Sequence, residues 1–111
     1  MAGQSIFDMK LSKVYPLLVQ KAERKGRTKA EVDQVIAWLT GWDMSKVDME
    51  MGYGDFFRFA PAMNPRAGLI RGSICGIKVE EIKDPLMQKI RWLDKLVDEL
   101  AKGKPIEKIL R

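Results

Sequence analysis

The chain of 111 residues contains no histidine, and this absence excludes more chemistry than any residue present supplies. Histidine is the usual general base near neutral pH and the commonest metal ligand. Its absence removes Ser-His-Asp and Cys-His catalysis, and the common zinc sites built on histidine or several cysteines. The single cysteine, Cys75, forms no intrachain disulfide and suits a reducing compartment. Any catalysis is left to carboxylates, lysine, tyrosine or an unaided thiol.

Long apolar runs and glycine-rich phosphate loops are also missing. No stretch approaches the roughly 20 apolar residues that span a bilayer, and residues 1–10 lack the pattern of a signal peptide. We therefore expect a cytoplasmic protein with no membrane partner. Neither G-x-G-x-x-G nor G-x-x-x-x-G-K occurs, so no nucleotide loop is predicted. The sequence predicts no cofactor and no metal site.

Composition and periodicity predict one helical domain over residues 1–111. Hydrophobic residues make up 46% of the chain and charged residues 32%, which is typical of a globular protein. Apolar side chains recur at helical spacing, and the expected helices span residues 12–26, 28–41, 45–52, 55–60, 84–103 and 105–110. We predict a small all-α orthogonal bundle of about five helices. The alternative is an α+β fold with one short hairpin in residues 69–82, where three glycines interrupt strand-like residues.

Capping signals mark the helix ends. Thr28 and Glu31 have capping-box spacing, so each side chain is expected to accept a bond from the other residue's backbone N–H. Asp84 and Pro85 suit the start of the longest helix, and Gly41 suits a helix stop. Ser12 and Ser45 are the expected N-caps of two further helices.

A basic segment is the first candidate binding site. The net charge is +5, and five cations lie close together in the sequence: Lys21, Arg24, Lys25, Arg27 and Lys29. They flank the expected start of a helix, whose free N–H groups attract anions, so they are candidate ligands for phosphate or nucleic acid. The alternative, which is favoured, is a solvated loop whose cations stabilise a helix C-terminus. A looser basic set closes the chain: Lys102, Lys104, Lys108 and Arg111.

Sequence-specific DNA binding is not favoured. Residues 28–51 have tolerable spacing for a helix-turn-helix, but Asp48 and Glu50 lie on the segment that would enter the major groove. Aromatic and basic residues do not alternate in the manner of single-strand binders. Nucleic acid therefore remains the less favoured partner.

Cys75 is the centre of the enzyme hypothesis, with Ser73, Glu80 and Glu81 as neighbouring polar groups. A cysteine becomes nucleophilic when a base or a helix N-terminus lowers its pKa. Free cysteines are also among the most buried residues, and that structural interpretation is favoured. Asp94 and Asp98 lie four residues apart, where a solvated charged face is favoured over an acid–base pair. We assign no catalytic residue and regard the protein as more typical of a non-enzyme.

Large side chains favour an interaction module. Trp38, Trp42 and Trp92 occur together with seven methionines, and such residues serve either as core or as adaptable binding surface. A small helical domain with this many large side chains is expected to self-associate through an apolar surface that includes tryptophan or methionine. This homo-oligomeric interaction module is the function that the sequence favours.

Several strings resemble a family of uncharacterised bacterial proteins, domain of unknown function 2200. The matching strings are VYP at 14–16, VQKAERKGRT at 19–28, EVDQ at 31–34, WLTG at 38–41, AP at 60–61, MNP at 63–65, ICG at 74–76, VEEIKDPLM at 79–87 and DKLVDELAKG at 94–103. They are specific and cover nearly the whole chain. The resemblance implies bacterial origin and a compact, largely α-helical domain, and it brings no activity, cofactor or catalytic residue.

Overall fold

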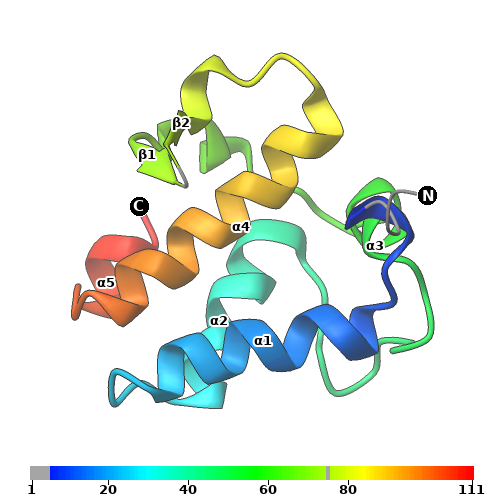
Figure 1. Cartoon of the computed structure of the whole chain (residues 1–111), viewed down its shortest axis with the longest axis horizontal. Helices are drawn as coiled ribbons and strands as arrows, with labels where there is room; N and C mark the ends of the chain where they lie inside the picture. The colour runs from blue at the N-terminus through cyan, green and yellow to red at the C-terminus, as the bar shows by residue number, and fades with distance from the viewer. Residues whose placement is uncertain (1–5, 75) are drawn as a thin grey trace.

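One long helix organises the fold (Figure 1). The computed structural model describes residues 6–74 and 76–111, and in it α4 (Pro85–Ala101) contacts α1 (Leu11–Glu23), α2 (Lys29–Thr40), α3 (Tyr53–Arg58) and α5 (Ile106–Ile109). Its apolar stripe is buried at Ile90, Leu93, Leu96, Val97 and Leu100. Burial of this stripe stabilises α4, since a helix in a protein is held more by packing than by propensity. The expected bundle of about five helices is confirmed.

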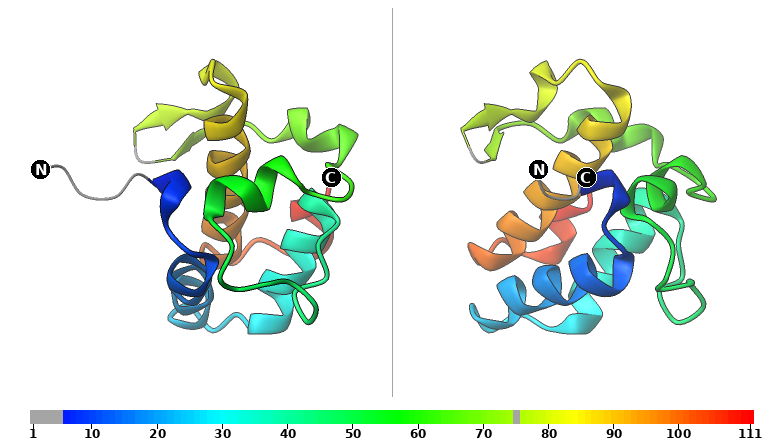
Figure 2. Two further views of the ribbon diagram at one scale, coloured as in Figure 1. Left: turned by 90° about the vertical axis from the view of Figure 1, so that its right-hand side faces the viewer. Right: turned by 45° about the vertical axis from the view of Figure 1, so that its right-hand side comes forward.

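Helices α1 and α4 run in the same direction, and this arrangement positions the candidate site. Both helices point their carboxyl ends toward the same side of the molecule (Figure 1). Helix α2 packs against both of them, while α3 covers the other end of α4 (Figure 2). As a result, the last turns of α1 and α4, which are far apart in the sequence, are neighbours in space.

The helix-capping predictions are confirmed at three ends. The Thr28 hydroxyl accepts from the Glu31 backbone N–H at 3.1 Å, and the Glu31 carboxylate accepts from the Thr28 backbone N–H at 3.1 Å. Gly41 ends α2 with a φ of +80°, a conformation that favours glycine. Asp84 accepts from the first free N–H groups of α4, and Pro85 opens that helix.

Ser12 is not the N-cap of α1, so that prediction is wrong. The helix begins at Leu11, and Lys10 precedes it without a side-chain cap. The first free N–H groups are satisfied by a distant loop instead: Leu11 donates to the Met51 carbonyl at 2.9 Å and Ser12 to the Met49 carbonyl at 2.8 Å. A tertiary contact has replaced the local cap.

The short helix expected at residues 45–52 is also absent, and the described chain forms turns there. Asp43 accepts from the backbone N–H and hydroxyl of Ser45, and Asp48 accepts from the backbone N–H of Glu50. These local bonds compete with the helical ladder, which is why aspartate and serine favour turns.

A two-stranded hairpin occupies part of residues 69–82. Strand β1 (Ser73–Ile74) pairs antiparallel with β2 (Ile77–Lys78), with Ser73 opposite Lys78 and Ile74 opposite Ile77. A 3₁₀ turn follows at Val79–Glu81. The fold is therefore a helical bundle that carries the short hairpin named in the alternative prediction. Cys75 lies outside the described residues.

Candidate anion-binding site

The basic segment of residues 21–29 is divided by the turn between α1 and α2. Helix α1 ends at Glu23, and Gly26 reverses the chain with a φ of +80° before α2 begins at Lys29. Cations on either side of Gly26 therefore face different neighbours. Neighbouring positions in the sequence do not form a single surface here.

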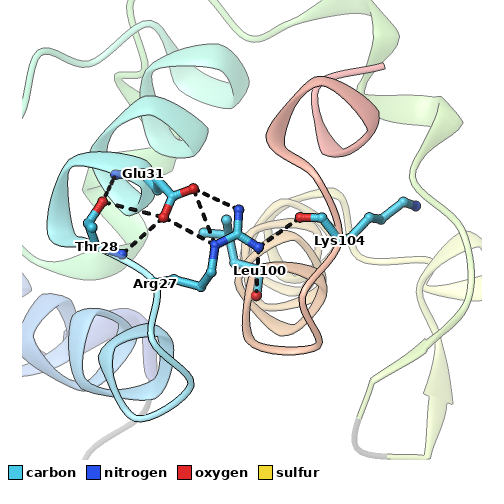
Figure 3. Close-up of polar contacts among 5 residues, drawn as sticks. All are labelled: Arg27, Thr28, Glu31, Leu100 and Lys104. Atoms are coloured by element: carbon cyan, nitrogen blue, oxygen red, sulfur yellow. Dashed lines mark hydrogen bonds and ion pairs between the residues drawn. The ribbon is translucent and has the colours of Figure 1, made fainter.

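Arg27 is committed to a structural contact (Figure 3). Its Nε and Nη2 atoms donate to the Glu31 carboxylate at 2.7–3.2 Å. Its Nη1 donates to the Leu100 carbonyl at 3.1 Å and to the Lys104 carbonyl at 2.8 Å. The guanidinium thus joins the start of α2 to the last turn of α4, at Leu100, and to the segment that follows it, at Lys104. Arg27 is the hub of this polar clamp and is not free to bind a ligand.

Glu31 is held ionised by the same contacts. Hydrogen bonds from Arg27, then from the Thr28 backbone, lower the pKa of Glu31 from 4.5 to about 2, against the opposing effect of burial. The pKa of Arg27 is raised, chiefly by its bond to Glu31. The pair is therefore charged throughout the physiological pH range.

Lys29 faces a different groove. Its ammonium lies 3.3 Å from Asp33 Oδ2 and 5.6 Å from the centre of the Tyr15 ring. The Tyr15 hydroxyl donates to Asp33, and burial, followed by that bond, raises the pKa of Tyr15. Lys29 is thus paired within a cluster on the α1–α2 surface and lies apart from the other predicted cations.

The remaining three cations do meet at one hollow. Lys21, Arg24 and Lys25 line it from the end of α1, and α4 contributes Asp98, Ala101 and Lys102. We call this site the basic hollow; its volume is about 430 Å³. Sequence reasoning identified Lys102 only as part of a separate basic set and regarded Asp98 as part of a solvated face. The missing information was the parallel packing of α1 on α4, which no local pattern reveals.

Asp98 is the acidic centre of the basic hollow. Its carboxylate lies 3.1 Å from Lys102 Nζ, 3.5 Å from Lys21 Nζ and 3.9 Å from Lys95 Nζ, and its side chain is only 15% exposed. Burial opposes ionisation, but the hydrogen bond from Lys102 and the charges of Lys21, Lys102 and Lys95 together lower the pKa of Asp98. Asp98 is therefore an ionised acceptor surrounded by ammonium groups.

The polar residues near the hairpin do not form a comparable site. The Glu80 carboxylate accepts from the Gly72 backbone N–H at 3.1 Å, and backbone bonds lower the pKa of Glu80. The Ser73 carbonyl accepts from Lys95, and Glu81 is exposed. Within residues 6–74 and 76–111, no three acidic or cysteine side chains are grouped so that they would hold a metal ion. Glu80 therefore supports the base of the hairpin.

The three tryptophans are half-buried and pack against the core. Trp42 donates its ring N–H to the Phe56 carbonyl at 2.7 Å and stacks on the Phe56 ring. The large apolar side chains exposed in the described chain are instead Leu17, Phe59, Leu69 and Ile77. Within the described ranges, no helix is both long and apolar enough to cross a membrane.

Comparisons with known proteins identify the family. A family model described as "Uncharacterized protein conserved in bacteria" (DUF2200) matches residues 5–111. The chain is similar to the crystal structure of an uncharacterized protein, SP1917, with a TM-score of 0.90 and 50% sequence identity over 98% of this chain and 93% of that one. Among curated proteins no match was found. The chain belongs to the DUF2200 family of uncharacterized proteins conserved in bacteria.

Proposed function

We propose that this protein binds a small phosphate-bearing ligand in the basic hollow. The observation that carries the proposal is the convergence of four cations around one carboxylate at the carboxyl ends of two helices: Lys21, Arg24, Lys25 and Lys102. Arg24 and Lys25 are exposed, and in the described part of the chain neither side chain has an ion-pair partner. Both are therefore available to an incoming anion.

The charge balance of the basic hollow favours an anion. Four cations and one carboxylate leave a net charge of +3 among the lining residues. The carboxyl ends of α1 and α4 also point here, and each contributes roughly −0.5 charge through its helix dipole. The local excess is thus about +2, which matches a doubly charged phosphate group.

The size of the basic hollow favours a small ligand over a nucleic acid. Its volume of about 430 Å³ falls within the roughly 300–1,000 Å³ typical of small-molecule sites. None of the described residues that line it is aromatic, whereas sequence-independent single-strand binders stack bases on aromatic rings. Duplex binders neutralise a row of phosphates along a stripe, and these cations form a compact group.

The test is a titration of ¹⁵N-labelled protein with inorganic phosphate at low ionic strength, followed by NMR. We expect saturable shifts in residues 21–26 and 98–103, which weaken as salt is added. A triple variant, Arg24→Gln with Lys25→Gln and Lys102→Gln, should lose about tenfold or more in affinity. The matched control neutralises three exposed lysines elsewhere, Lys13→Gln with Lys46→Gln and Lys83→Gln, and should retain binding.

Two results would overturn the proposal. One is the absence of saturable shifts in the wild-type protein. The other is equal loss of binding in the triple variant and its control, which would assign the effect to net charge alone. A labelled oligonucleotide is measured in parallel by fluorescence anisotropy. If the oligonucleotide binds through the same residues with an affinity about a hundredfold higher than that of phosphate, the ligand of the basic hollow is a nucleic acid and not a small molecule.

Self-association is a second candidate, supported by an exposed aromatic side chain. Phe59 is 65% exposed at the end of α3, in a loop whose Ala62 backbone N–H donates to the Thr40 carbonyl at 3.0 Å. The neighbouring turn lines a groove of about 370 Å³ that includes Trp42 and Met44. An exposed aromatic side chain near a groove suits an isologous dimer, in which Phe59 of each copy inserts into the groove of the other copy.

Sedimentation equilibrium over a wide concentration range tests this second candidate. We expect a monomer–dimer equilibrium that Phe59→Ser weakens about tenfold or more. Leu17→Ser, at another exposed apolar residue, is the control and should leave the equilibrium unchanged. A strictly monomeric mass at the highest concentration would refute self-association.

A further inference from the structure

Asp98 is an unexpected residue at the centre of an anion-binding surface. Its carboxylate offers about four acceptor positions and no donor when ionised. The three surrounding ammonium groups lie at 3.1, 3.5 and 3.9 Å, so only one is at close hydrogen-bonding distance. Acceptor capacity therefore remains on the face that lines the basic hollow.

An anion in the basic hollow would meet donors and an acceptor at once. The cations Arg24, Lys25 and Lys102 supply donors only, whereas Asp98 supplies an acceptor only. An oxyanion without a proton places its lone pairs against the Asp98 carboxylate, which is repulsive. An oxyanion that carries an O–H group instead donates to Asp98 while its remaining oxygens accept from the cations.

We propose that Asp98 makes the basic hollow selective for oxyanions that carry their own O–H donor, with hydrogen phosphate as the simplest case and sulfate as the rejected one. The inference rests on the proposed phosphate-binding function and specifies its ligand class. The donor is either the P–OH group of the phosphate or a hydroxyl next to a phosphate ester. Asp98 is thus a specificity-determining residue of the site.

Hydrogen phosphate and sulfate form a well-matched pair for testing this role. At about pH 8 both are tetrahedral doubly charged anions, but only hydrogen phosphate keeps a proton. The coulombic repulsion from Asp98 and the attraction from the cations are the same for both, so they cancel in the affinity ratio. The ratio therefore reports the hydrogen bond to Asp98. A charged hydrogen bond at a partly exposed site corresponds to about tenfold in affinity.

The experiment compares phosphate and sulfate binding by NMR titration at pH 8 in three proteins. The wild type should bind phosphate about tenfold more tightly than sulfate. Asp98→Asn keeps the side-chain shape, removes the charge and adds an amide donor, so sulfate should bind more tightly and the ratio should fall to about one. Glu23→Gln makes the same charge change on α1 outside the basic hollow and should shift both affinities alike.

Two phosphate esters distinguish the sources of the donor. Methyl phosphate has no O–H at pH 8 and should bind as weakly as sulfate. Glycerol phosphate carries hydroxyl groups, and affinity close to that of hydrogen phosphate would assign the donor to the organic part of the ligand. Affinity as low as that of methyl phosphate would assign it to the P–OH group.

The outcomes separate this inference from the proposed function. Equal wild-type affinity for phosphate and sulfate, or an unchanged ratio in Asp98→Asn, would overturn the selectivity while leaving anion binding intact. Absence of binding of both anions would overturn the proposed function and the inference together. The amide spectrum of each variant reports its fold. The side-chain oxygen of an Asn at position 98 can still accept from Lys21, Lys95 or Lys102, which favours a folded variant.

Discussion

Replacement of Arg27 by methionine should destabilise the fold more than the same replacement at any other lysine or arginine of residues 21–29. The methionine keeps most of the apolar stem and removes the guanidinium. The change deletes the bonds to Glu31 and to the carbonyls of Leu100 and Lys104, all between 2.7 and 3.2 Å. The Arg27 side chain is only 15% exposed, so water replaces these bonds incompletely.

The magnitude follows from the hydrogen bonds that are lost. The two charge-assisted bonds to the Leu100 and Lys104 carbonyls contribute about 1 kcal/mol each at a partly exposed site. The ion pair with Glu31 adds about 0.5–1 kcal/mol. The expected loss is therefore about 2–3 kcal/mol of unfolding free energy. An unfolding entropy of roughly 2.1 cal/mol/K per residue then lowers the Tm by about 10 °C.

Urea denaturation followed by tryptophan fluorescence measures the loss, with thermal unfolding by circular dichroism as the second probe. Arg24→Met is the matched control because Arg24 is exposed and lies three residues earlier; its change should stay within about 0.5 kcal/mol. Arg27→Lys keeps the charge but not the planar fork, and it should recover less than half of the loss. Equal stability of Arg27→Met and the wild type would refute the clamp.

Three further predictions concern other elements. Gly41→Ala should cost at least about 1 kcal/mol more than Gly26→Ala in the same assay, because both residues have a φ of +80° but a Cβ on Gly41 would lie 2.9 Å from the Ala62 nitrogen. Tyr53→Phe should maintain stability or raise it by up to about 1 kcal/mol, since the buried Tyr53 hydroxyl has no hydrogen-bond partner in the described chain; a loss of more than about 1 kcal/mol would contradict this. Glu31→Gln should lower the free energy of unfolding above pH 4.5, because the ionised carboxylate is stabilised only in the folded state, where its pKa is about 2. The difference in stability between Glu31→Gln and the wild type should shrink as the pH falls from 4.5 toward 2, as measured by urea denaturation at each pH. A difference that does not change with pH would contradict this prediction.

The parts of the fold that sequence predicts are those with local causes. The Thr28–Glu31 capping box, the Asp84–Pro85 start and the Gly41 stop each depend on a few neighbouring residues, and all three are confirmed. The start of α1 depends instead on carbonyls of the loop before α3, more than 35 residues away. No propensity or spacing rule contains that information, and local spacing therefore predicts Ser12 as the cap where Lys10 precedes the helix.

The candidate site was predictable in part for the same reason. Lys21, Arg24 and Lys25 are spaced three and four residues apart, which places them together wherever α1 packs. Their partners are Asp98 in the last turn of α4 and Lys102 directly after that helix, and they join the site because α1 and α4 are parallel and end together. That packing is a property of the whole core and has no local signature.

The division of the basic segment also explains why its number of charges overestimates its number of anion ligands. A count over residues 21–29 suggests five equivalent anion ligands, yet the left-handed turn at Gly26 gives them three different surroundings. Arg27 reaches the end of α4, Lys29 lies over Tyr15, and only the cations before the turn line the basic hollow. Substituting all five would therefore combine a loss of stability with any loss of binding. Variants limited to Arg24, Lys25 and Lys102 avoid this ambiguity, because the clamp at Arg27 stays intact.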